Sequence, residues 1–135
     1  MIEVAVVLDR QHRPLHWHEP PDADAAALPD SRDLWEALWA ARAQLSGVAH
    51  SHLHRGRPAP SWTDLTTFAA CEAGLGVRLS WWIVTLDDAS CFTHRGPGRY
   101  DYTGRTAIDQ ETAAWIAELR RRSLRDHPAG GLETP

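Results

Sequence analysis

Three residues whose types and spacing suit metal chemistry lie near the middle of the 135-residue sequence. His50 and His52 are separated by one residue, and alternate side chains of a β-strand point to one face, so both imidazoles can reach one metal ion. Asp64 follows at the start of a predicted helix and can supply a third ligand. We therefore expect a zinc site at His50, His52 and Asp64. Three protein ligands leave the fourth coordination position of zinc to water, which is typical of catalytic rather than structural sites.

Each half of this pattern also has a purely structural interpretation. Ser61-x-x-Asp64 before an apolar run resembles a capping box at a helix start, which is common without any metal. An isolated His-x-His is more often surface polarity than a ligand pair. The two patterns together in one strand–loop–helix unit favour the metal site, and Ser61 can cap the helix and also serve catalysis.

The elements that must position these residues follow from the hydrophobic pattern. The predicted strands cover residues 2–8, 14–18, 47–50, 77–86, 90–94 and 99–102. The predicted helices begin at Asp30 or Ser31 and end at Gly47, begin at Ser61 and end at Gly74 or Gly76, and run from 106 to 123. We expect loops at 19–29 and 52–60. This order, β-β-α-β-α-β-β-β-α, predicts an α/β (α+β) domain with a single mixed sheet flanked by helices.

The helices should bury apolar stripes at helical spacing. In the first helix the inward residues are expected to be Leu34, Trp35, Leu38, Trp39 and Leu45. In the second they are Leu65, Phe68, Ala69 and Leu75, and in the third Ile108, Trp115, Ile116 and Leu119.

The segment around the histidines resembles the JAB/MPN (JAMM) metalloproteases. That family carries His-x-His-Pro, a short loop and Ser-x-x-Asp at a helix start, preceded by a distant glutamate that begins a hydrophobic strand. This chain reads His-Ser-His-Leu at 50–53 and Pro-Ser-Trp-Thr-Asp-Leu at 60–65, and Glu3 is followed by Val-Ala-Val-Val-Leu. The resemblance covers residues 2–103.

The resemblance implies a JAB/MPN fold of cytidine-deaminase-like architecture and a zinc-dependent isopeptidase. Glu3 would be the general base and Ser61 the donor to the oxyanion. The substrate would be a ubiquitin-like or sulfur-carrier protein, cut after its C-terminal Gly-Gly. The short chain is typical of a bacterial or archaeal enzyme from an antiviral-defence or ubiquitination-like operon that encodes E1-like and E2-like partners. The alternatives are a phage-type or cell-wall endopeptidase on the same fold and a non-catalytic MPN scaffold.

Three features depart from the family pattern. Leu53 replaces the usual proline, the loop before Ser61 is one residue longer than the commonest form, and the helix that normally precedes the glutamate is missing. Glu19 and Glu36 are the other glutamates upstream of the histidines, but they lie in a predicted loop and a predicted helix, and neither begins a strand.

Four further signals are weaker. His16-Trp17-His18 is a second His-x-His, which we interpret as strand surface because no acidic helix start follows it. His54 lies in the loop and is expected to be solvated. Arg120-Arg121-Arg122 with Arg125 either binds an acidic partner or lies at a helix C-terminus, where positive charge is favoured. Trp62 either lines a substrate groove or packs against other side chains of the protein.

The bulk composition is that of an ordinary globular domain. Hydrophobic residues make up 43% and charged residues 24%, and the net charge is −4, so nothing suggests a nucleic-acid or membrane partner. Cys71 and Cys91 lack CxxC spacing, and the absence of a signal-peptide pattern favours the cytoplasm, with reduced thiols. We expect one domain over residues 1–126 and a loose tail over 127–135.

Overall fold

The computed structural model describes residues 1–19, 32–106 and 110–125. The strands are β1 (Ala5–Asp9), β2 (Pro14–His18), β3 (Leu45–Ser51), β4 (Ser80–Val84), β5 (Ala89–His94) and β6 (Tyr102–Thr106). The helices are α1 (Arg32–Ala40), α2 (Trp62–Leu75) and α3 (Gln110–Leu124). The element order is the predicted one.

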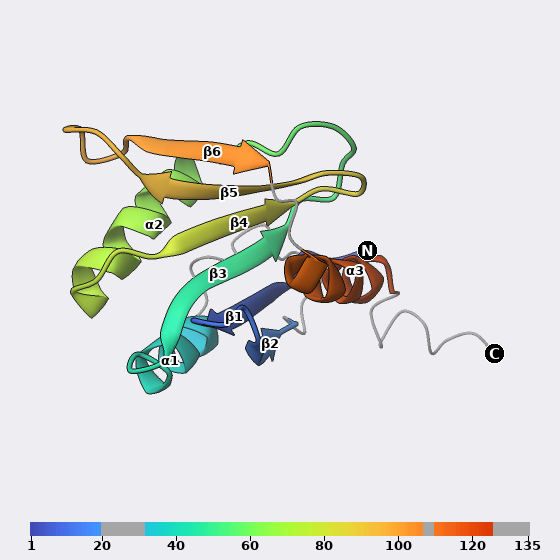
Figure 1. Ribbon diagram of the computed structural model, residues 1–135, viewed down its shortest axis with the longest axis horizontal. Helices are drawn as coiled ribbons and strands as arrows, with labels where there is room; N and C mark the ends of the chain where they lie inside the picture. The colour runs from blue at the N-terminus through green and yellow to red at the C-terminus, as the bar shows by residue number, and fades with distance from the viewer. Residues whose placement is uncertain (20–31, 107–109, 126–135) are drawn as a thin grey trace.

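The six strands form a single mixed sheet in the order β2-β1-β3-β4-β5-β6 (Figure 1). β3 and β4 are parallel and are joined through α2, whereas the other neighbouring strands are antiparallel. The predicted fold class, a mixed α/β sheet flanked by helices, is therefore confirmed.

Helices cover both faces of this sheet. On one face, Val6 and Leu8 of β1 join a core with Trp115 and Leu119 of α3. On the other face, Ala5 and Val7 join a core with residues of α1 and α2, and Figure 1 shows α3 on the opposite side of the sheet from α2. Because successive strand residues point to opposite faces, a strand buried on both sides is apolar throughout. This explains the uninterrupted apolar run at the start of the chain.

The segment ahead of β1 is fixed by hydrogen bonds to two other elements. The Ile2 N–H donates to the Ser123 carbonyl oxygen at the end of α3 (2.9 Å), and the Ser51 N–H donates to the Val4 carbonyl oxygen (3.0 Å). The Val4 N–H donates to the buried Ser51 hydroxyl (3.0 Å), which also accepts from Ser123 Oγ (2.7 Å). The strand β1 therefore begins at Ala5 rather than at residue 2 as predicted, but these hydrogen bonds fix the backbone from residue 2 onward.

The first helix is shorter than predicted, and Leu45 and Gly47 lie in β3 rather than in or after that helix. A side chain at Gly47 would lie 2.5 Å from the Ser80 carbonyl oxygen, so the glycine permits close approach of β3 and β4 instead of capping a helix. Trp35 and Trp39 are exposed rather than inward-facing.

The two tryptophans of α1 are exposed because only a narrow stripe of this helix is buried. Leu34 and Leu38, one turn apart, are the buried residues of this helix. The Trp35 ring lies beside α2, where a Cβ added to Gly74 would come within 2.8 Å of it.

The predicted strand at 99–102 was wrong, because the turn before it is longer. The Gly98 N–H donates to the Asp101 carboxylate (2.8 Å), and the Arg95 N–H donates to the Asp101 carbonyl oxygen (2.8 Å). These bonds hold the chain in a turn through Asp101. β6 therefore starts at Tyr102 and includes Thr106, which was predicted to begin a helix.

Some predictions fall on parts of the chain outside the described residues. They are the loop over 20–29, the cap at Asp30 or Ser31, the inward position of Ile108 and the tail at 127–135. Within residues 1–19, 32–106 and 110–125, no helix combines the length and apolar character needed to cross a membrane.

Candidate metal centre

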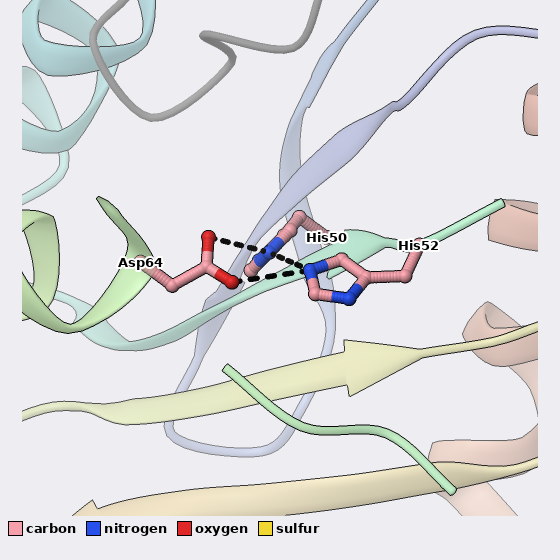
Figure 2. A group of neighbouring side chains, drawn as sticks. All are labelled: His50, His52 and Asp64. Carbon is pink, nitrogen blue, oxygen red and sulfur yellow. Dashed lines mark hydrogen bonds and ion pairs between the residues drawn. The ribbon is translucent and has the colours of Figure 1, made fainter. Parts of the chain in front are cut away.

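His50, His52 and Asp64 converge on one point between β3 and α2. Nε2 of His50 lies 3.0 Å from Nε2 of His52 and 3.2 Å from Oδ1 of Asp64, and Nε2 of His52 lies 3.1 Å from Oδ2 of Asp64. Figure 2 shows the two rings and the carboxylate pointing toward one another. Within the described part of the chain, this is the one group of three His, Cys, Asp or Glu residues that could hold a metal ion.

The sheet fixes the two histidines. His50 lies near the end of β3, in register with Ala5 of β1 and Ile83 of β4. The His52 N–H donates to the Val84 carbonyl oxygen (2.9 Å), so the extended backbone continues beyond the end of β3. The i, i+2 spacing therefore directs both imidazoles to the face covered by α2.

The start of α2 fixes the aspartate. The Asp64 N–H donates to the Ser61 hydroxyl (3.0 Å), while Oδ2 of Asp64 accepts from the Ser61 N–H (2.9 Å). This reciprocal pair is a complete capping box. Because the same Oδ2 faces His52, the cap orients the carboxylate toward the histidines.

Burial and charge at the centre favour an ionised carboxylate. His50 and Asp64 are each only 4% exposed, and His52 is half-buried. Burial alone raises the pKa of Asp64, but hydrogen bonds with His50 and His52 outweigh it and hold that pKa well below its usual value. Two ring nitrogens and a carboxylate this close together form a donor set suited to a cation.

Glu3 lies on the same side of the sheet, beside the metal ligands. Its neighbours Ile2 and Val4 point into the core with α3, so alternation places the Glu3 side chain on the face of His50. Burial raises the pKa of the half-buried Glu3 carboxyl, His50 and His52 lower it, and Asp64 raises it. Glu3 is therefore close to all three ligands and is not a solvated residue of a frayed terminus.

The other glutamates upstream of the histidines lie elsewhere. Glu19 forms ion pairs with Arg122 and Arg125 of the α3 region, and Glu36 forms an exposed pair with Arg32 on α1. Neither joins the metal group.

The weaker sequence signals are also resolved. His54 is exposed, as expected. His16 is exposed but His18 is buried, so the interpretation of this pair as strand surface was wrong for His18. In register, His18 lies beside Ala5, and this places its side chain on the face covered by α1 and α2.

The arginines near the end of α3 bind within the chain. Arg120 donates to the carbonyl oxygens of Thr85 (2.9 Å) and Asp88 (3.1 Å). Arg121 and Arg122 both form ion pairs with Glu118. The Arg122 guanidinium also lies over the Trp17 ring, 4.2 Å from its centre.

Sequence reasoning missed two residues near the start of α2, Tyr100 and Arg99. The ring of Trp62, next to Ser61, lies 4.8 Å from that of Tyr100, and the Arg99 guanidinium lies 5.3 Å from the Tyr100 ring centre. Trp62 itself is exposed rather than packed in the core. No local pattern marks a contact between a helix start and a turn 38 residues away.

Comparison with models of known protein families found no match to this chain. Comparison with curated proteins likewise found none.

Proposed function

We propose that this protein is a zinc-dependent isopeptidase in which His50, His52 and Asp64 hold the metal. The observation that carries the proposal is the convergence of two imidazole nitrogens and one carboxylate, with spacings of 3.0–3.2 Å. Ligand atoms about 2.0–2.1 Å from a tetrahedral zinc ion lie roughly 3.3 Å apart, which is close to the distance between the two histidine nitrogens and to the distance from each nitrogen to its nearer Asp64 oxygen.

Zinc bound by three protein ligands would lower the pKa of a water molecule to about 7 and so supply a nucleophile at neutral pH. Glu3 accepts the proton that the attacking water loses and returns it to the leaving amine. The position of Glu3 suits this exchange, because its side chain lies on the same face of the sheet as His50 and interacts electrostatically with His50, His52 and Asp64.

Ser61 stabilises the oxyanion of the substrate. Its hydroxyl oxygen accepts the Asp64 N–H through a lone pair, which leaves the hydroxyl hydrogen to donate to the developing negative charge. The residue is exposed, so a substrate carbonyl can approach it.

The substrate class rests on the resemblance of residues 50–65 to the JAB/MPN motif. We propose a ubiquitin-like or sulfur-carrier protein, cleaved after its C-terminal Gly-Gly, with E1-like and E2-like proteins as functional partners. We place this activity in the cytoplasm, where the thiol of Cys91, buried in the core with α3, would remain reduced.

The test combines metal analysis with hydrolysis. The purified protein should contain one zinc per chain and release a reporter fused through the C-terminal glycine of a ubiquitin-like protein at neutral pH. His52→Ala should abolish both properties. The matched control is His54→Ala, which removes an exposed imidazole two residues away and should change neither.

Two results would contradict the proposal in different ways. Stoichiometric zinc in a His50→Ala/His52→Ala double variant would place the metal elsewhere. Full zinc occupancy without hydrolysis of any Gly-Gly-linked reporter would leave a metal-binding protein and favour the scaffold alternative.

A further inference from the structure

An aromatic pair, the exposed Trp62 and the half-buried Tyr100, lies at the N-terminal end of α2, the helix that carries Asp64. Trp62 is 64% exposed, and it lies between the capping residue Ser61 and the ligand Asp64. Its ring meets that of Tyr100 at 4.8 Å and 65°, in an edge-to-face contact. A large apolar side chain held at the surface loses the benefit of burial unless a partner covers it.

The turn that carries Tyr100 is fixed by its own hydrogen bonds. The Asp101 carboxylate accepts from the Gly98 N–H (2.8 Å), the Asp101 N–H donates to the Gly98 carbonyl oxygen (3.2 Å), and His94 Nε2 lies 2.7 Å from the same oxygen. A side chain at Gly98 would lie 2.6 Å from the Asp101 carboxylate, so glycine permits this tight turn. The aromatic pair is therefore presented in a fixed arrangement, which lowers the entropic cost of binding.

A cavity of about 410 Å³ lies along the C-terminal half of α2, and Arg99, which contacts the Tyr100 ring, is one of its lining residues. Ala69, Ala73 and Gly76, spaced three or four residues apart, line one side, and Arg78 and Arg99 border it. Small side chains on one stripe of a helix leave room for an extended chain.

The charge of this cavity favours an acidic occupant. Glu72 neutralises Arg78 through an ion pair of 2.8 Å. Arg99 lies over the Tyr100 ring and, among the described residues, forms no ion pair, so its guanidinium leaves a net positive charge. Guanidinium groups bind carboxylates through bidentate hydrogen bonds.

We propose that this surface, comprising Trp62, Tyr100, Arg99 and the cavity along α2, binds an extended segment of the substrate protein. An apolar side chain of that segment packs on Trp62 and Tyr100, and a nearby carboxylate pairs with Arg99. That the bound segment belongs to the substrate rests on the proposed isopeptidase function. The surface thereby selects which proteins reach the metal centre.

The first step of the test identifies the preferred sequence without using hydrolysis. A displayed library of random 12-residue peptides is selected on the full-length wild-type protein, and the winner is made as a fluorescein-labelled peptide without Gly-Gly. The selected peptides should share an apolar residue within a few positions of Asp or Glu. Absence of such a consensus would overturn the proposal.

The second step measures the affinity of that peptide by fluorescence polarisation. Trp62→Ala and Arg99→Glu should each raise Kd by at least about tenfold, because large aromatic and arginine anchors dominate such interfaces. A peptide with Lys in place of its acidic residue should bind Arg99→Glu better than it binds wild type. Equal affinity of wild type and both variants would also overturn the proposal.

Matched variants control for exposed tryptophan and for charge. Trp39→Ala removes an exposed tryptophan from α1. Arg105→Glu makes the same charge change on the other face of the sheet, because Arg105 pairs with Cys91 of the core with α3. Both should leave Kd within about twofold.

Hydrolysis then separates this proposal from the proposed function. If the reporter is cleaved, Trp62→Ala should raise KM about tenfold and leave kcat nearly unchanged. If the reporter is not cleaved, the peptide affinities still decide whether the surface binds an acidic, apolar segment.

Discussion

Asp64 serves both the helix start and the metal group with one carboxylate. Oδ2 closes the capping box of α2 and faces His52, while Oδ1 faces His50. The capping and metal-ligand interpretations of Ser61-x-x-Asp64 are therefore compatible, because the bond that caps the start of α2 also orients the carboxylate toward the histidines. Mutation of Ser61 can therefore separate its role in capping α2 from its proposed role in catalysis.

Ser61→Ala should separate capping from catalysis. The variant loses the hydroxyl that accepts the Asp64 N–H, which should lower the free energy of unfolding by about 1 kcal/mol. Zinc should remain, since the Ser61 N–H still holds the Asp64 carboxylate. If Ser61 donates to the oxyanion, turnover should fall by roughly 10²–10³-fold.

Thr66→Ala provides the control for Ser61, because it removes another hydroxyl from α2 whose bond is local to the helix. It should leave turnover unchanged. A loss of activity in Ser61→Ala that only matches its unfolded fraction would limit Ser61 to capping.

Glu3→Gln tests the proton transfer. Glutamine keeps the shape of the side chain but removes its basicity, so the variant should bind zinc and substrate while turnover falls by roughly 10²–10⁴-fold. Zinc content, reporter binding and single-turnover hydrolysis measure these properties separately. Glu19→Gln is the control, because Glu19 pairs with Arg122 and Arg125 instead of lying at the centre. Wild-type turnover in Glu3→Gln would end the assignment.

The convergence of the three candidate ligands could be predicted from the sequence because its geometry is local. His50 and His52 share a strand face through their spacing, and Asp64 is placed by its cap on the next element. Glu3 required the alternation of the first strand as well. Tyr100 and Arg99 could not be predicted, because the turn that brings them to Trp62 is set by the packing of the whole β5–β6 hairpin against α2.

Glu72 links α2 to the sheet at the end distant from the cap. Its carboxylate is almost wholly buried and accepts from the Tyr102 hydroxyl (2.6 Å), Arg78 (2.8 Å), the Leu79 N–H (2.9 Å) and Trp81 Nε1 (2.9 Å). The Trp81 ring stacks on Phe68, with centroids 4.3 Å apart. Because Phe68 also contacts the His50 ring, this network helps to position α2 relative to the metal group.

Glu72→Ala should therefore destabilise the fold. The change leaves the Trp81 indole N–H and the Leu79 N–H buried without their acceptor, and we expect the free energy of unfolding to fall by about 3 kcal/mol. Urea denaturation measures the difference. Glu36→Ala, which removes an exposed ion pair on α1, should change it by less than about 0.5 kcal/mol. Equal effects of the two substitutions would show that the Glu72 network adds little.

Element boundaries were predicted well where local signals decide them. Ser61 and Gly76 cap α2 as their residue types indicate, with Gly76 in the left-handed conformation at φ 74°. Element boundaries were predicted poorly where contacts with residues far away in the sequence decide them. Leu45 and Gly47 fit the end of a helix by pattern, but pairing with β1 and β4 draws them into the centre of the sheet.

At the scale of the whole molecule, the candidate centre draws on three separate parts of the chain. The N-terminal segment supplies Glu3, the end of β3 supplies the histidines, and α2 supplies Asp64. Hydrogen bonds join Ile2 to α3 and Val4 to β3, so the position of the N-terminal segment that carries Glu3 depends on α3. The candidate centre therefore exists only in the folded chain, so binding of a metal ion to it would be linked to folding.

Removal of metal should lower the thermal stability of the whole domain. A ligand that binds only the folded state stabilises it by about 2.7 kcal/mol when its free concentration is 100 times Kd. For a domain of this size, that corresponds to a Tm difference of roughly 10 °C between zinc-saturated and chelated protein. Circular dichroism melts with excess zinc and with EDTA measure it. The His50→Ala/His52→Ala variant should melt at one temperature in both conditions, while His54→Ala should keep the full difference. Identical melting of the wild-type protein with zinc and with EDTA would show that these three residues do not bind the metal in the folded state, because linkage requires any such binding to appear as stability.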